Sequence, residues 1–221
     1  MKELQKTELL HNQVYHILKG MIIDGEYQPG ERLVETRVAE RIGVSRGTIR
    51  EAFQMLLKDY LLVRNGKAIS VYNPSAQDIL DIYQCRISLE SLAVKLATQN
   101  ITDEELSKLA EVINDSKIAV NMNDTKKLTQ LNQEFHDIID LASHNHQLIQ
   151  LCDVIKTKIL YIRTSILKVH FKNFSDFVDD HERILIAIQN RDPVRAEQEM
   201  HSHIEKSFNT IKATFKTVID Q

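Results

Sequence analysis

Apolar residues recur every three or four positions along most of this chain, which is the period of a helix that buries one face. Between Leu33 and Leu57 the pattern breaks once, at Gly43. Glycine takes a positive φ without strain and so ends the first apolar run, and Ser45 can cap the run that follows. We therefore expect two short helices joined by a tight turn.

The second of these helices combines an apolar face with a basic one. Its buried stripe is expected to comprise Ile49, Ala52, Phe53, Leu56 and Leu57. Its other face begins with Arg46, Thr48 and Arg50. A helix-turn-helix lays the N-terminal residues of its second helix against base edges and phosphates in the major groove. The pattern favours DNA binding but does not require it, since helix pairs with a glycine turn also occur in other proteins.

Short strands are predicted after this helix. Two β-prone runs within residues 60–71 flank Asn65-Gly66, a pair that favours a two-residue hairpin turn. A hairpin directly after a recognition helix is a wing. Arg64 and Lys67 lie at its tip, around a glycine that allows close approach to a phosphate backbone.

The pattern after the wing is helical, and Asn73-Pro74-Ser75 separates the two regions. Proline cannot donate to a strand, and Ser75 followed by Asp78 marks a helix start. We therefore expect two domains, residues 1–74 and 75–221. The predicted helices are 7–24 in the first domain, with Val14, Ile17, Leu18, Met21 and Ile22 facing inward, and 76–99, 102–121, 125–142, 145–170, 174–190 and 192–217 in the second.

These elements define a mainly α fold. It consists of an N-terminal winged helix-turn-helix, with three helices and a β-hairpin wing, followed by an all-α antiparallel bundle of about six helices. A bundle of this kind can enclose a pocket between its helices.

Composition adds three constraints to this picture. Of 221 residues, 43% are hydrophobic, which is enough for folded cores, and no apolar run is long enough for a membrane span or an export signal. Residues 1–74 carry 11 Lys+Arg against 9 Asp+Glu, whereas the rest carries 17 against 22, so a basic excess lies at one end. We expect a cytoplasmic protein with no membrane partner, in which Cys85 and Cys152 are buried free thiols.

Candidate chemistry in the second domain rests on three histidines in helical patterns, His136, His181 and His203. Asn132 precedes His136 by four residues, so both side chains project from one helix face. Three neutral imidazoles and one oxygen ligand suit Zn²⁺ or another first-row divalent metal. Lone helical histidines are also common as satisfied polar residues, and spacing alone does not decide between the two.

Arg86 and Arg163 lie at positions that the pattern directs inward. A buried guanidinium needs a carboxylate partner. For Arg86, the carboxylate of Glu90 one turn later is a candidate within the same helix.

Residues 27–35 and 39–52, which include Pro29-Gly30 and Gly43-Val44-Ser45-Arg46, resemble the N-terminal domain of GntR-type bacterial transcription regulators. The resemblance runs without gaps over about residues 14–71. It implies that Arg46 and Arg50 contact the operator. Some relatives carry a further operator-contacting arginine where this chain has Thr36, with Arg37 beside it. The full predicted DNA-binding set is Arg37, Ser45, Arg46, Thr48, Arg50, Gly66 and Lys67.

Residues 76–215 resemble the FCD effector domain of the FadR subgroup of the same family. The matching residues are 86–90, 132–136, Asn145, 180–184, Ala187-Ile188 and His203. In metal-binding relatives an Asp and three His on three helices hold one divalent cation, and these positions are occupied here by Asn132, His136, His181 and His203. An amide oxygen brings no charge, so the expected ion, Zn, Ni or Mn, should be held less tightly. The resemblance also implies that Arg86 and Arg163 help the metal to bind a small organic acid.

The sequence therefore predicts a transcription regulator with no catalytic step. A homodimer would place two recognition helices on half-sites of a pseudo-palindromic double-stranded DNA operator, and a carboxylate bound in the bundle would change operator occupancy. Two alternatives remain. One is a metal-dependent hydrolase, for which Glu134 and Asp140 are acidic candidates only by their proximity in sequence. The other is an architectural DNA binder whose helical domain only dimerises.

Overall fold

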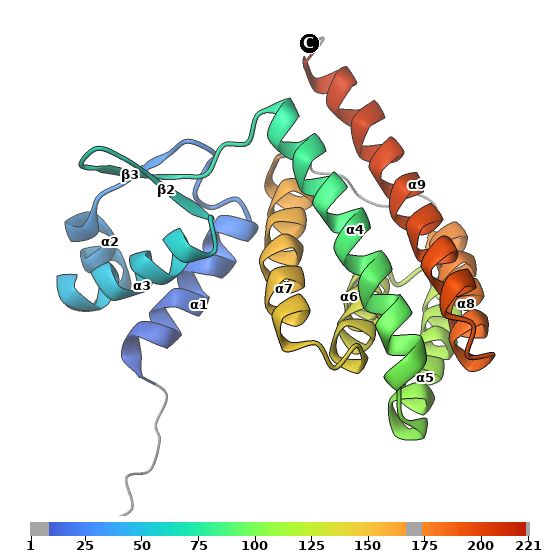
Figure 1. The fold of residues 1–221 in the computed structure, drawn as a ribbon. Helices are drawn as coiled ribbons and strands as arrows, with labels where there is room; N and C mark the ends of the chain where they lie inside the picture. Colours follow the sequence, from blue (N-terminus) through green and yellow to red (C-terminus); the bar gives the residue numbers. More distant parts are fainter. Residues whose placement is uncertain (1–8, 167–173, 220–221) are drawn as a thin grey trace, which may run out of the picture. The chain divides into compact units, whose positions relative to one another are not determined.

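The computed structural model describes residues 9–166 and 174–219 (Figure 1). Most of these residues lie in helices, and the strands form one small three-stranded sheet, which confirms the mainly α prediction. Contacts divide the described chain into two compact units. The first unit contains the residues up to Gln77 and a later stretch that starts at Lys156, and the second contains Asp78–Ile155 and the helices from Phe174 onward.

The first unit contains the predicted winged helix-turn-helix. Its elements are α1 (Leu10–Ile23), β1 (Arg32–Leu33), α2 (Glu35–Ile42), α3 (Arg46–Lys58), β2 (Leu62–Asn65) and β3 (Ala68–Val71). The sheet order is β1-β3-β2, and both pairings are antiparallel. The sequence does not predict β1, because two residues are too few to display a strand period. The predicted start of the first helix, residue 7, lies outside the described residues.

The turn between α2 and α3 forms as predicted. Gly43 has a φ of 80°, and its N–H donates to the carbonyl oxygen of Ala39 at 2.9 Å. Ser45 precedes α3, and its hydroxyl accepts the backbone N–H of Thr48 at 3.2 Å. Glycine at a left-handed position and a serine cap thus define where the first helix ends and the second begins.

The hairpin is present, but its loop is shifted by one residue from the prediction. Asn65 pairs with Ala68, so the two-residue loop is Gly66-Lys67 rather than Asn65-Gly66. Gly66 has a φ of 62°, and the first loop residue of a type II′ hairpin needs a positive φ of this kind. Lys67 therefore sits in the loop itself, where it is exposed.

The core of the first unit joins α1 to α3 and to the sheet. Its buried members include Val14, Leu18, Ile22, Ile49, Ala52, Phe53, Leu56, Leu61, Leu62, Ile69 and Val71. Of the α1 residues predicted to face inward, Met21 is partly buried, whereas Ile17 is 49% exposed. The prediction for Ile17 is wrong because the buried α1 stripe repeats every four residues and leaves this position outside it.

The second unit is built from long helices. They are α4 (Ala76–Asn100), α5 (Asp103–Asn121), α6 (Thr125–Ala142), α7 (His146–Tyr161), α8 (Phe174–Gln189) and α9 (Pro193–Ile219). Helix α5 packs against α6 and α8, and α8 packs against α9. The predicted helices are confirmed to within a few residues, except that the one expected over 145–170 changes at Ile162 into a π-helical turn, η1 (Ile162–Ile166), beyond which the prediction falls outside the described residues.

The end of α7, from Lys156 onward, and the whole of η1 belong to the first unit. The Tyr161 hydroxyl donates to the carbonyl oxygen of Tyr72, which follows the wing. The Thr164 hydroxyl donates to the carbonyl oxygen of Ile23 at the end of α1, at 2.8 Å. The first unit therefore contains a segment from late in the chain that a boundary placed at residue 74 leaves out.

No helix within residues 9–166 and 174–219 is long and apolar enough to cross a membrane. Neither Cys85 nor Cys152, both within the described residues, takes part in a disulfide bond. Cys152 is buried, as predicted, whereas Cys85 is exposed. The prediction for Cys85 is wrong because α4 turns Tyr83 and Arg86 inward, and this leaves Cys85 on the outer face.

Candidate functional site

Three histidines from three helices meet in the interior of the second unit. His136 lies on α6, His181 on α8 and His203 on α9, and each offers a ring nitrogen within 4.8 Å of the other two. The Nε2 atoms of His181 and His203 are 3.3 Å apart. The three residues are 4%, 1% and 6% exposed, respectively. The structure thus brings together all three histidines that the sequence singled out.

Aromatic side chains hold His181 in place. The ring of Phe135 stacks on it, with centroids 3.8 Å apart and planes inclined by 10°. Phe177 approaches the same imidazole edge-on, at 5.4 Å between centroids. Sequence reasoning missed both contacts, because the two phenylalanines look like ordinary core positions in a helical pattern.

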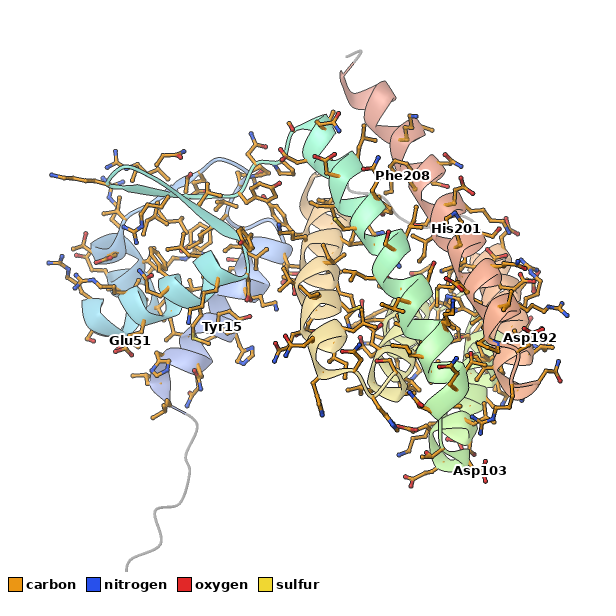
Figure 2. All side chains as sticks on the ribbon, in the orientation of Figure 1. Tyr15, Glu51, Asp103, Asp192, His201 and Phe208 are labelled. Carbon is orange, nitrogen blue, oxygen red and sulfur yellow. The ribbon has the colours of Figure 1, made fainter. Side chains whose placement is uncertain are left out.

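Helix α9 also packs on α4. Phe208, which is labelled in Figure 2, stacks on Tyr83 with ring centroids 5.3 Å apart. His201, also labelled there, is exposed although it precedes the buried His203 by only two residues. On α9, therefore, His203 is buried in the histidine cluster and His201 lies at the surface.

The His181 imidazole stays neutral. Burial, reinforced by the neighbouring His203, His136 and Arg86, holds the pKa of His181 well below its usual range. A neutral imidazole keeps one nitrogen lone pair free, and this is the form that binds a metal ion.

A carboxylate lies behind each of the other two imidazoles. Oε2 of Glu90 is 2.8 Å from Nδ1 of His136, and Oδ2 of Asp180 is 3.5 Å from Nδ1 of His203. A carboxylate at Nδ1 favours a proton there and leaves Nε2 as the electron-pair donor, an arrangement that is typical of metal-ligating histidines. Lys206 donates to Asp180 at 2.7 Å and offsets its charge. Sequence reasoning missed Asp180, although it directly precedes His181.

His136 provides the test of whether a metal fits this cluster. Both of its ring nitrogens are buried and unsatisfied by hydrogen bonds to described residues, although Nδ1 lies 2.8 Å from Oε2 of Glu90. A buried unsatisfied nitrogen is costly, and a cation bound at Nε2 would remove that cost. Three imidazole nitrogen donors, two of them backed by carboxylates, fit Zn²⁺ or a similar divalent ion.

Arg86 and Glu90 form a buried ion pair. Nε of Arg86 donates to Oε1 of Glu90 at 2.6 Å, which confirms the pairing considered from the sequence. Burial would raise the pKa of Glu90, but Arg86 and His136 outweigh it and hold this pKa well below its usual range. Nη1 of Arg86 remains buried with no hydrogen bond to a described residue.

The remaining predicted ligands occupy different places. Asn132 is half-buried one helical turn before His136 on α6, in a position to face the same cluster. Arg163 is half-buried in η1, within the first unit, so the structure does not group it with the histidines. The roles assigned to both residues stay predictions.

The predicted DNA-binding residues lie on α2, at the start of α3 and in the hairpin loop. All are exposed except Thr48, which is half-buried: they are Arg37, Ser45, Arg46, Arg50, Gly66 and Lys67. The hydroxyls of Ser45 and Thr48 are 2.9 Å apart and hydrogen-bonded to each other, so these two side chains form the N-terminal cap of α3. That cap leaves the first backbone N–H groups of α3 pointing outward, where a helix favours an anion.

A winged helix-turn-helix followed by a helical unit defines a class of DNA-binding transcription regulators. Residues 10–71 match the gntR family of bacterial regulatory proteins, and residues 81–206 match the FCD domain. The chain belongs to the GntR family, in the group that carries a C-terminal FCD domain. The matching families and relatives are regulators rather than enzymes, so the hydrolase alternative is set aside.

Individual relatives agree with this assignment. The chain is 34% identical to the HTH-type transcriptional regulator YdhC of Bacillus subtilis, over 95% of this chain and 94% of that protein. It is 30% identical to the HTH-type transcriptional repressor GlaR of Escherichia coli, over 86% and 90% of the two chains. Among solved structures, E. coli McbR/YncC shares the fold with a TM-score of 0.73 at 22% identity. The match covers 95% of this chain and 100% of that chain.

Proposed function

We propose that this regulator is a repressor that binds a pseudo-palindromic operator as a homodimer and responds to a small organic acid through a metal-dependent site in its FCD domain. The repressor assignment is supported by relatives such as GlaR and the gluconate operon repressor of Bacillus licheniformis, which is 25% identical to this chain. The observation that carries the metal-dependent site is the buried Nε2 of His136, which has no hydrogen bond to a described residue and lies in a cluster of three imidazoles.

The proposed metal ligands are Asn132, His136, His181 and His203. A divalent ion held by these residues would supply open coordination positions for a ligand carboxylate. Glu90 and Asp180 orient two of the imidazoles from behind. Because Asn132 contributes a neutral oxygen, we expect weaker retention of the ion than an aspartate would give, with Zn²⁺, Ni²⁺ and Mn²⁺ as the candidates.

Arg86 is the proposed anion-binding group beside the metal. Its Nε atom is occupied by Glu90, whereas its buried Nη1 has no hydrogen bond to a described residue. Its charge reaches the cluster, since Arg86 contributes to lowering the pKa of His181. An organic acid that contacts both Nη1 and the metal would satisfy this donor. The further contribution proposed for Arg163 rests on the family resemblance alone.

On the DNA side, we assign base and phosphate contacts to Arg46 and Arg50 at the start of α3. Gly66 and Lys67 would follow the phosphate backbone at the wing tip, while Arg37 contacts DNA from α2. Ser45 and Thr48 would lie near the backbone and keep α3 correctly capped. The acid changes operator occupancy only if it binds the DNA-competent and DNA-free conformations with different affinity.

Metal analysis tests this proposal first. Purified protein, incubated with Zn²⁺, Ni²⁺ or Mn²⁺ and desalted, is expected to retain about one ion per chain by elemental analysis, and the His136→Ala/His181→Ala/His203→Ala variant none. His201→Ala is the matched control, because His201 is exposed on α9 two residues before His203. Retention by the triple variant would overturn the assignment. Protein that never retains metal would support the architectural alternative, in which the histidines are structural.

A further inference from the structure

Arg50 of the recognition helix is already held by a carboxylate in the DNA-free chain. Its Nη2 donates to Oε2 of Glu35 at 3.1 Å, and its Nε donates to Oε1 of the same carboxylate at 3.4 Å. The contact joins α3 to α2 across the helix-turn-helix. Fifteen residues separate the partners, so no local pattern in the sequence reveals the pair.

The carboxylate is the anchored member of this pair. Glu35 is the first residue of α2, where the positive end of the helix dipole favours a negative charge. Its side chain is 25% exposed, whereas that of Arg50 is 59% exposed. The more buried and shorter side chain therefore determines where the more exposed guanidinium points.

The geometry of the pair leaves one edge of the guanidinium available. A guanidinium can present its Nε–Nη2 edge or its Nη1–Nη2 edge to a partner with two acceptors. Glu35 occupies the Nε–Nη2 edge, whereas Nη1 makes no hydrogen bond to any residue in the described part of the chain. The remaining Nη1–Nη2 edge can bind O6 and N7 of a guanine in the major groove.

We propose that Glu35 is a positioning residue that orients Arg50 for a bidentate contact with a guanine of the operator. This inference rests on the proposed DNA-binding role of Arg50. An unsupported arginine samples many rotamers and loses that freedom on binding, so a side chain held in advance binds its target at lower entropic cost. The same carboxylate repels phosphate, which discourages Arg50 from settling on the DNA backbone instead.

Arg46 provides a contrast within the same helix turn. No described residue forms an ion pair or hydrogen bond with its side chain in the structure, and it is exposed. An unrestrained arginine at the start of a helix suits a phosphate, which accepts a cation from many directions. In this proposal, Arg50, which Glu35 holds, contacts a base, and Arg46, which no described residue holds, contacts a phosphate.

The experiment uses the full-length protein and a duplex selected from a randomised DNA library by that protein. Dissociation constants are measured by fluorescence anisotropy for this duplex, for an unrelated duplex, and for copies in which each guanine in turn is replaced by 7-deazaguanine, which lacks N7. The variants are Arg50→Ala, Glu35→Ala and Glu35→Gln. The matched control is Glu26→Ala. Glu26 likewise forms an exposed ion pair with an arginine, Arg41 of α2, at 2.7 Å.

We expect one guanine whose replacement weakens binding of the unmodified protein about tenfold, as the loss of half of a bidentate contact would. Arg50→Ala should abolish this penalty. Glu35→Ala should reduce it to about twofold while binding to the unrelated duplex stays the same or becomes tighter. Glu35→Gln, which keeps one acceptor oxygen, should be intermediate, and Glu26→Ala should retain the full penalty.

Three outcomes would contradict the proposal. They distinguish a failure of the positioning role of Glu35 from a failure of the base contact assigned to Arg50. A full penalty in Glu35→Ala, together with its loss in Arg50→Ala, would overturn only the positioning role. A full penalty in both variants would overturn the base contact assigned to Arg50. No penalty at any guanine in the unmodified protein would exclude guanine N7 as its target. Thermal unfolding midpoints of all variants establish that each one is folded.

Discussion

Glu90 accepts a hydrogen bond from Arg86 one helical turn earlier on α4, with 2.6 Å between Oε1 and Nε and both side chains at most 6% exposed. Two opposite charges are thus removed from water together, and each compensates the other. The second oxygen of Glu90 lies beside His136, so this single carboxylate links the ion pair to the histidine cluster.

Removing the charge of Glu90 should strongly destabilise the fold. Glu90→Gln leaves the Arg86 guanidinium buried without its counter-charge, and we expect a loss of about 3–5 kcal/mol in the free energy of unfolding. Urea denaturation of chelator-treated protein measures it. Glu104→Gln is the control, because Glu104 pairs with Lys108 at the same four-residue spacing but at the surface, where no measurable shift is expected. Equal shifts in the two variants would show that burial does not strengthen the α4 pair.

The stability of the metal-free protein should fall as the pH is lowered from 7 to 5. The pKa of His181 is depressed in the folded state, so below the usual range of histidine the unfolded chain binds a proton that the folded chain does not. Stability is therefore present above that range and is lost as the pH falls. The free energy of unfolding, measured by urea denaturation, should change less steeply with pH in His181→Phe than in the unmodified protein. The two slopes should differ by at most about 1.4 kcal/mol per pH unit.

The pH slope of the free energy of unfolding tests this prediction, whereas its value at a single pH does not. Phenylalanine at position 181 retains stacking with Phe135, although it changes the overall stability. His201→Gln, at an exposed position on α9, should keep the slope of the unmodified protein. An unchanged slope in His181→Phe would mean that this imidazole does not account for the acid sensitivity.

Restoring a carboxylate at position 132 should tighten metal binding. Asn132→Asp replaces a neutral oxygen with an anionic one at the same place on α6, and we expect the dissociation constant for Zn²⁺ to fall about tenfold or more because charge–charge attraction is added. Competition with a chromophoric chelator measures the constant. Asn145→Asp serves as a charge-matched control on the same unit. Equal constants for Asn132→Asp and the unmodified protein would remove Asn132 from the ligand set.

Two glycines of the helix-turn-helix should respond in opposite directions to alanine. Gly43 has a φ of 80°, so Gly43→Ala forces a side chain into a left-handed conformation and should cost about 1–2 kcal/mol. Gly47 lies in α3, and a Cβ there would be 3.7 Å from Oγ of Ser45, an ordinary contact. Gly47→Ala should therefore stabilise the protein by about 0.5 kcal/mol. Thermal unfolding of both variants tests the pair, and a loss of stability in Gly47→Ala would contradict this account.

Local patterns account for the parts of this protein that were predicted correctly. The period around Gly43, the cap at Ser45 and the long amphipathic runs each depend on residues that are neighbours in sequence, and all were confirmed. The Gly66-Lys67 loop was misplaced because Asn-Gly and Gly-Lys both permit a two-residue turn, and the choice depends on strand register.

The site was predictable only in part for the same reason. The helical pattern singled out His136, His181 and His203, resemblance to the FCD domain supported the choice, and the structure brings the three together. Other contacts at these sites join segments that are distant in sequence, such as Asp180 with His203 and Glu35 with Arg50. The local pattern of either segment does not determine how the two segments align, so these contacts could not be predicted.

Helix α7 has a consequence for how the two units are connected. The chain leaves the first unit after Gln77 and returns to it within α7, at Lys156. The first unit is therefore joined to the second at more than one point of the chain, and one of these joins lies within α7. A fragment that ends at residue 74 would lack the hydroxyls of Tyr161 and Thr164, which donate to the backbone carbonyls of Tyr72 and Ile23.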